Sequence, residues 1–199
     1  MEYGFERPVA LWGGVLYEAD VGQRREPVKT MHTFGGGLDL EARGFPQGKR
    51  PLHRLLTLDL SDENLALPAT QHRLLPFCYG FVYSGCRLTY KVLDDATLEI
   101  ETFDPKAPTV DWPHADYPKQ FESRPMTWRR VRSMSNEEAQ GLTWQGLDVD
   151  IDSQLIVVVP PSKDYGVSLW GDIGDAEQVQ VVFSFDPVSA IVRATNQCS

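Results

Sequence analysis

The chain has 199 residues, of which 42% are hydrophobic and 24% are charged, and its formal net charge is −9. A chain of this length can bury a core without disulfide or metal support, and this composition excludes wholesale disorder. The charge is uneven, because residues 1–93 hold 11 Lys/Arg against 10 Asp/Glu whereas residues 94–199 hold 8 against 18. An acidic surface on the second half would repel nucleic acid and anionic membranes and attract a basic protein. The alternative is that these acids only keep the protein soluble.

Targeting and redox features predict a cytoplasmic protein. Residues 1–20 mix acids with apolar residues and lack the basic start and unbroken apolar run of a signal peptide. No later stretch reaches the roughly 18 apolar residues that span a membrane. The three cysteines, Cys78, Cys86 and Cys198, are odd in number and lack CxxC spacing, which is typical of a reducing compartment.

Strand patterns dominate the chain. Apolar and polar residues alternate with the period of a half-buried strand in 56–60, 97–101, 147–151 and 179–181. Residues 155–159 are continuously apolar, which predicts a strand covered on both faces.

Two consecutive hairpins are also expected. Residues 77–83 and 87–93 are rich in strand formers and flank the turn Ser84-Gly85, which predicts that they pair. Residues 94–96 then separate the second of these strands from 97–103. The three strands are therefore predicted to form a meander.

Helix signals are few. Residues 135–138, Ser-Asn-Glu-Glu, form a capping box, and Gly141 should end that helix early. A second short helix is expected to begin at Ser61. The predicted fold class is α+β and β-rich, with mostly antiparallel sheets and a few short helices.

The proline-rich stretch 104–125 is expected to be a long irregular connection, and long loops in compact domains often carry function. We expect residues 1–199 to form a single domain. Two packed β-rich halves joined by 104–125 are the alternative arrangement.

Two segments carry part of the pattern of a phosphate or metal site, but neither carries all of it. The glycines 35–37 are not followed by the Gly-Lys-Ser/Thr of a phosphate loop, so they predict a turn. Asp148, Asp150 and Asp152 are spaced like the start of a calcium loop, but Ser153 and Val159 stand where that loop needs Gly and Glu. We therefore predict that these acids form the wet face of a strand, and we expect no metal and no cofactor.

Catalytic and nucleic-acid motifs are similarly weak. The four histidines form no HxH or HExxH pair, which argues against zinc. Cys78 and Cys86 are expected to be core or turn residues, with a catalytic cysteine and a distant histidine left as an alternative. Residues 128–132, Trp-Arg-Arg-Val-Arg, are the one basic run beside an aromatic residue, and we expect a solvated strand face or an internal partner for the acidic surface.

Several short motifs occur in a recognisable order: 35–38, then 51–60 before Leu67-Pro68, then 74–79 and, late in the chain, the Trp-Gly-Asp-Ile-Gly of 170–174 followed by 179–185. In this order they resemble the YwqG-like family of bacterial domains of unknown function. The chain departs from the family at Phe45-Pro46, where Trp-Pro is usual. The resemblance implies a β-rich α+β domain without an established catalytic constellation. Members often lie near polymorphic-toxin genes, which implies an immunity protein.

We therefore expect an inhibitor that binds a basic toxin domain, preferably a cytoplasm-acting nuclease, and neither nucleic acid nor membrane. An enzyme with dispersed catalytic residues, or a small-ligand or scaffold binding module, remains the alternative. The acids of the second half should supply the charge, and aromatic residues in its Pro- or Gly-rich segments should supply the anchors. The expected contact residues are Asp148, Asp150, Asp152, Asp172, Asp175, Glu177, Trp112, Tyr117 and Trp170.

Overall fold

The computed structural model describes residues 5–22, 31–46, 52–68, 70–81, 85–105, 120–141, 150–161 and 179–198. These residues contain twelve strands and one helix: β1 (Val9–Trp12), β2 (Val15–Val21), β3 (Thr33–Phe34), β4 (Glu41–Arg43), β5 (Leu52–Asp59), β6 (Leu74–Gly80), β7 (Cys86–Asp94), β8 (Thr97–Pro105), β9 (Arg124–Ser133), α1 (Asn136–Gly141), β10 (Leu155–Val159), β11 (Val179–Asp186) and β12 (Ile191–Cys198).

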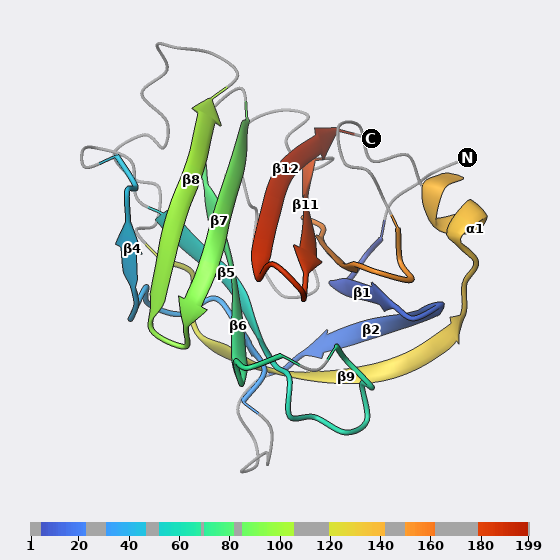
Figure 1. Ribbon diagram of the computed structural model, residues 1–199. Helices are drawn as coiled ribbons and strands as arrows, with labels where there is room; N and C mark the ends of the chain where they lie inside the picture. Colours follow the sequence, from blue (N-terminus) through green and yellow to red (C-terminus); the bar gives the residue numbers. More distant parts are fainter. Residues whose placement is uncertain are drawn as a thin grey trace.

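The strands hydrogen-bond in one continuous order, β4-β8-β7-β12-β11-β10-β1-β2-β9-β3-β5-β6 (Figure 1). Neighbours are antiparallel except β4 and β8, which run parallel. The prediction of a β-rich, mostly antiparallel protein is therefore confirmed. Strands that precede and follow the stretch 104–125 pair directly with one another, as β7 does with β12 and β2 with β9.

The sheet folds over so that its last strand, β6, lies against β7 and β12. The main core fills the space between these layers, where the rings of Phe77 and Phe183 meet at a centroid distance of 5.1 Å. Leu56 and Leu58 of β5 and Leu88 of β7 belong to the same buried cluster. Apolar burial on this inner side is the main favourable contribution to the fold.

A second, smaller core covers the opposite face of the central strands. Ala10 of β1 belongs to the main core, whereas its neighbours Val9 and Leu11 belong to the second cluster with Met134 and with Ala139 of α1. Alternate side chains of a strand point to opposite faces, so β1 is buried on both. The same holds for β10, in which every residue is buried, as its unbroken apolar run predicted.

One of the two predicted hairpins is wrong. β7 and β8 pair as expected, from Cys86 opposite Pro105 to Asp94 opposite Thr97. β6 does not pair with β7, because its ladder is with β5 while β7 takes β12 as its second neighbour. The chain between β6 and β7 thus passes from one layer to the other, and a meander does not form.

Other local predictions also need correction. Residues 56–59 of the segment 56–60 do lie in a strand, but they are not half-buried, because Asp59 is 0% exposed and Thr57 is buried as well. Residues 61–66 form turns and not the short helix expected to begin at Ser61. Of the stretch 104–125, residues 106–119 lie outside the described residues, and β9 already begins at Arg124.

The glycine turn is confirmed at Gly35 and Gly36, whose φ angles are 66° and 95°. The N–H of Gly35 donates to the carbonyl oxygen of Leu55 at 2.7 Å. A Cβ atom on Gly35 would lie 2.4 Å from the carbonyl oxygen of Glu122, which is closer than real Cβ contacts. The turn therefore needs glycine both for its backbone angle and for its close approach to another segment.

We predict that Gly35→Ala destabilises the protein by about 1–3 kcal/mol more than Gly13→Ala. Gly13 has a similar φ of 56° but nothing within 4 Å of its hypothetical Cβ, so it reports the cost of the backbone angle alone, about 1–2 kcal/mol. Gly35 adds steric overlap with backbone, for which about 1–3 kcal/mol is typical. Urea unfolding of both variants measures the difference in the free energy of unfolding. Equal losses of stability would contradict the steric overlap expected at Gly35.

Candidate protein-binding surface

Only two of the nine expected contact residues, Asp150 and Asp152, are among the described residues. Asp148 lies in 142–149, Trp112 and Tyr117 lie in 106–119, and the other four lie in 162–178, all outside the described part of the chain. The structure therefore describes only the part of the expected surface around Asp150 and Asp152.

The expectation that these acids line a strand is wrong for residues 150–151, which lie in a turn before β10. The carboxylate of Asp150 holds this turn, because it accepts hydrogen bonds from the Ser153 hydroxyl at 2.6 Å and from the Asp152 N–H at 3.1 Å. Such local bonds from an aspartate side chain favour turns over strands. Asp152 remains exposed.

Asn136, the first residue of α1, ties this turn to the helix. Its Nδ2 donates to Asp150 at 3.1 Å and to Asp152 at 2.6 Å, and its Oδ1 accepts from the N–H of Ile151 at 2.9 Å. The predicted capping box is also present: Ser135 Oγ accepts from the Glu138 N–H at 3.1 Å, and the Glu138 carboxylate accepts from the Ser135 N–H at 2.8 Å.

Four carboxylates therefore lie on one small unit, which we call the α1 acidic cluster: Glu137, Glu138, Asp150 and Asp152. Hydrogen bonds hold the last three, and Glu137 is exposed on the first turn of α1. The pKa of Asp150 is lowered by the Ser153 hydroxyl, by Asn136 and by the Asp152 N–H. The pKa of Glu138 is lowered by the Ser135 N–H and by Arg132, which pairs with it at 3.0 Å. Asp150 and Glu138 therefore stay ionised at neutral pH and below it. The two glutamates were visible in the capping box, but only the fold places them beside the aspartate turn.

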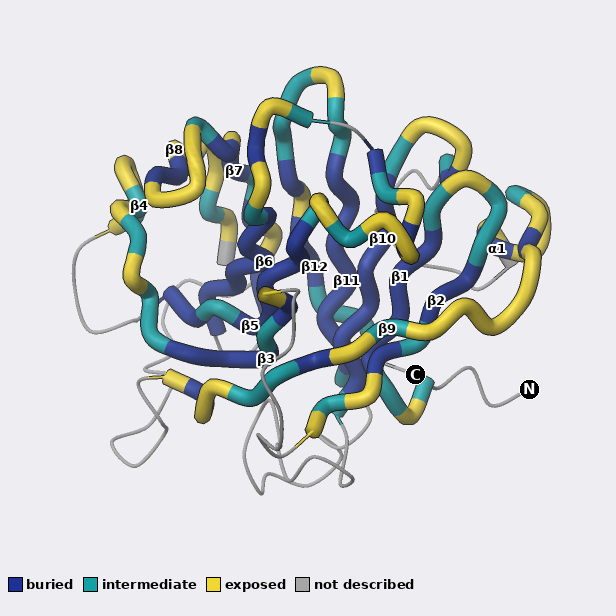
Figure 2. Tube along the Cα trace, turned by 90° about the horizontal axis from the view of Figure 1, so that it is seen from below, coloured by how far each residue is buried: buried dark blue, intermediate teal, exposed yellow. Residues whose placement is uncertain are grey.

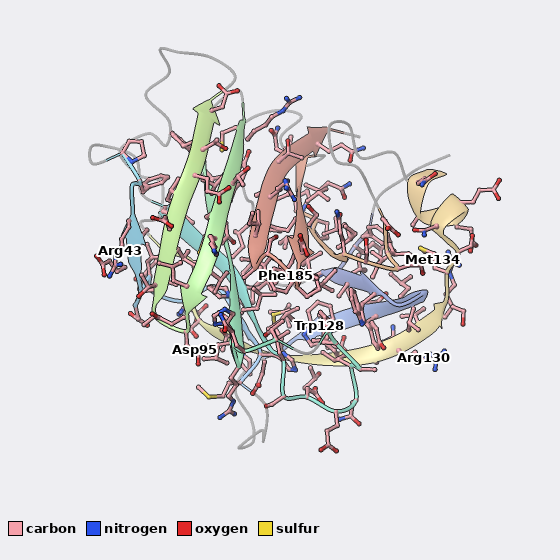
Figure 3. All side chains as sticks on the ribbon, viewed as in Figure 1. Arg43, Asp95, Trp128, Arg130, Met134 and Phe185 are labelled. Atoms are coloured by element: carbon pink, nitrogen blue, oxygen red, sulfur yellow. The ribbon has the colours of Figure 1, made fainter. Side chains whose placement is uncertain are left out.

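The basic run of residues 128–132 lies in β9, beside this cluster in the chain. Residues 129–133 are exposed, so the prediction of a solvated strand face is confirmed. Arg129 pairs with Glu18 of β2, and Arg132 pairs with Glu138 of α1. The arginines therefore also serve as internal partners for acids. Figure 3 labels Trp128 on the inner side of β9 and Arg130 at the lower rim of the molecule.

A buried polar network around His32 was not predicted. The N–H of Asp59 donates to His32 Nδ1 at 3.0 Å, which assigns the ring proton to Nε2, and Nε2 donates to Asp62 at 2.9 Å. Both ring nitrogens are engaged, so neither is available to take a proton from a substrate. The two partners of His32 lie far from it in the chain, at the end of β5 (Asp59) and in the turn that follows (Asp62). The only sequence signal for this network is the presence of a charged residue, Asp59, in an otherwise apolar strand.

Asp59 is the centre of that network. Burial raises its pKa, but hydrogen bonds from Arg73, Ser61 and the N–H of Met31 outweigh burial and hold the pKa well below its ordinary value. The Arg73 guanidinium lies 3.1 Å from this carboxylate and is half exposed. The buried charge is thus compensated by donors from three segments, which is the condition for a stable buried carboxylate.

The two described cysteines, Cys78 and Cys86, are confirmed as core residues. Both are fully buried, and burial raises the pKa of Cys78 to about 12. The Cys86 thiol donates to the carbonyl oxygen of Gly80 at 3.0 Å. A thiol in this environment does not form the thiolate that nucleophilic catalysis requires.

No family model, no curated protein and no solved structure matches the chain. Within the described ranges, no group of three or more His, Cys, Asp or Glu side chains is arranged to hold a metal ion. The one helix there, α1, is six residues long and cannot cross a membrane.

We predict that Asp59→Asn lowers the free energy of unfolding at pH 7 and makes it depend less on pH in the acidic range. The folded-state pKa of Asp59 lies below its ordinary value of 3.8, so its stabilisation is complete above that pH and is lost as the pH falls toward the folded pKa. The loss at pH 7 should be about 2–3 kcal/mol, typical of hydrogen bonds to a charged group. Urea unfolding between pH 7 and pH 2.5 measures both effects.

The matched control for this experiment is Asp39→Asn, because the Asp39 side chain is 83% exposed. It should leave both the stability at pH 7 and the acid dependence close to wild type. If the free energy of unfolding of Asp59→Asn falls between pH 5 and pH 2.5 as steeply as that of wild type, protonation of Asp59 is not the main cause of acid destabilisation.

Proposed function

We propose that the protein is an immunity-type inhibitor, which binds a basic toxin domain and blocks its active surface. The observation that carries the proposal is the α1 acidic cluster, in which Asn136 and the capping box hold the carboxylates of Asp150, Asp152 and Glu138 beside the exposed Glu137. Acids held in place need little reorganisation on binding, and they speed association with a basic partner. Among toxins, a nuclease fits best because its substrate surface is basic.

Other parts of the proposal rest on the sequence. The α+β assignment and the immunity role are what the resemblance to the YwqG-like family implies. The acidic composition and the cysteine usage support a cytoplasmic location. The partner is expected to be a protein and not a nucleic acid or membrane, since the net charge of −9 opposes both.

The test is growth rescue from a candidate toxin, taken from the reading frames that neighbour this gene and expressed in a bacterial host with and without this protein. We predict that wild type restores growth and that the double variant Glu137→Lys/Asp152→Lys does not. Both positions are exposed, and Asp150, which holds the turn, is left intact. With purified proteins, the variant should slow association by tenfold or more at low salt, and the difference should shrink at high salt.

The matched control is Glu99→Lys/Glu101→Lys, which makes the same change of charge on exposed positions of β8. It should rescue growth like wild type. If both double variants rescue equally, the α1 acidic cluster is not the contact surface. If wild type neither rescues growth nor forms a complex with the neighbouring toxin, the immunity function is wrong.

A further inference from the structure

β9 continues well beyond the strand that covers its outer edge. β2 pairs with β9 from Met126 to Ser133, whereas β3 pairs only with Arg124 and Pro125. Residues 127–133 therefore have no neighbouring strand on their second edge within the described ranges. In Figure 2, exposed residues follow β9 toward α1, while β12, β11, β10 and β1 are largely buried.

The backbone of this segment offers hydrogen-bonding groups to a further strand. The N–H of Met126 points away from β2, because it donates to the carbonyl oxygen of His32 at 3.0 Å. Backbone groups of alternate residues point the same way, so the N–H and C=O of Trp128 also project from the open edge. Such an edge is a template for strand addition by another chain.

The side chains of the segment select for negative charge. Arg130 lies opposite Tyr17 and forms no ion pair with a described residue. Arg129 and Arg132 lie on the other face, as their pairs with Glu18 and Glu138 show. Val131 is 43% exposed, at the point where the register of β2 and β9 shifts. Arg130 is therefore the arginine of this segment that lacks an acidic partner among the described residues, and an acidic strand added at the open edge would supply one.

We propose that the open edge of β9, residues 127–133, binds an extended acidic segment of a partner protein as an added β-strand. A second copy of this chain fits poorly, because antiparallel pairing of two β9 edges would bring the arginines of both copies together, and like charges across a strand pair are destabilising. This surface lies next to the α1 acidic cluster but has the opposite charge, so the inference goes beyond the proposed function.

The competing explanation is that the arginines and the irregularity only protect the edge from unwanted pairing, as charged residues and bulges do in many sheets. The two explanations differ in one respect. A protected edge binds no strand, whereas a docking edge binds an extended peptide through both charge and backbone.

The probe is a fluorescein-labelled octapeptide of alternating glutamate and threonine, measured by fluorescence anisotropy against the full chain. We expect saturable binding that weakens at least tenfold when glutamine replaces glutamate, and at least tenfold when alternate peptide nitrogens are methylated. Arg130→Glu should weaken binding at least tenfold, and Arg130→Ala should weaken it less. Arg87→Glu, the same change on an exposed position of β7, should stay within twofold of wild type.

Amide hydrogen exchange supplies the readout of strand addition, because the Trp128 N–H should become protected when the peptide binds. Folding of each variant is checked by circular dichroism and by its unfolding midpoint. The proposal is overturned if folded wild type does not bind the glutamate peptide, if the methylated peptide binds equally well, or if a single-stranded oligonucleotide binds more tightly. None of these measurements uses the toxin, so they are independent of the growth-rescue test.

Discussion

The hydroxyl group of Tyr90 replaces the hydrogen bonds that a neighbouring strand would give to β6. The N–H of Cys78 donates to this hydroxyl at 2.9 Å, and the hydroxyl donates to the carbonyl oxygen of Pro76 at 2.9 Å. β6 ends the strand order, yet it is almost entirely buried, so its free edge would leave backbone groups without water or partner. Each such group costs about 1–3 kcal/mol. Burial raises the pKa of Tyr90 well above its ordinary value, which keeps the proton needed for donation.

Tyr79 makes the reciprocal contact from β6 to β7. Its hydroxyl accepts from the Cys86 N–H at 2.9 Å and donates to the Cys86 carbonyl oxygen at 3.1 Å. The two tyrosine hydroxyls thus supply hydrogen-bond partners to backbone N–H and C=O groups of β6 and β7 that no neighbouring strand pairs. The two layers of the sheet can therefore pack against each other without leaving these buried groups unpaired. With β5 and β6 folded inward, β9 runs on past β3 along the rim to α1 (Figure 1). Both surfaces lie along this path: the basic segment 127–133 is the part of β9 beyond β3, and the α1 acidic cluster lies on the helix that follows it and on the turn before β10.

The sequence predicts this protein well where the determinants are local. Residues 155–159 are apolar enough to specify a strand covered on both faces, and residues 135–138 specify a helix start through their own side chains. Prediction fails where distant segments compete. The turn at 84–85 is compatible with a hairpin, but β5 and β12 are better partners for the strands on either side of it. Asp59 lies in an alternating pattern that suggests exposure, yet Arg73 and Met31 compensate its charge in the interior. The expected contact residues were chosen from charge and from aromatic residues in Pro- or Gly-rich segments. Neither criterion contains the local hydrogen bonds by which Asp150 makes a turn where a strand face was expected.

The dependence of the fold on Tyr90 is tested most directly by Tyr90→Phe, compared with Tyr17→Phe. Tyr17 is also a buried ring of the main core, but its hydroxyl makes no hydrogen bond to a described residue. Urea unfolding at pH 7 should show that Tyr90→Phe loses about 2–4 kcal/mol, since it leaves a buried N–H and a buried C=O without partners. Tyr17→Phe should stay within about 0.5 kcal/mol of wild type. A loss for Tyr90→Phe no larger than that for Tyr17→Phe would contradict the claim that this hydroxyl closes the edge of β6.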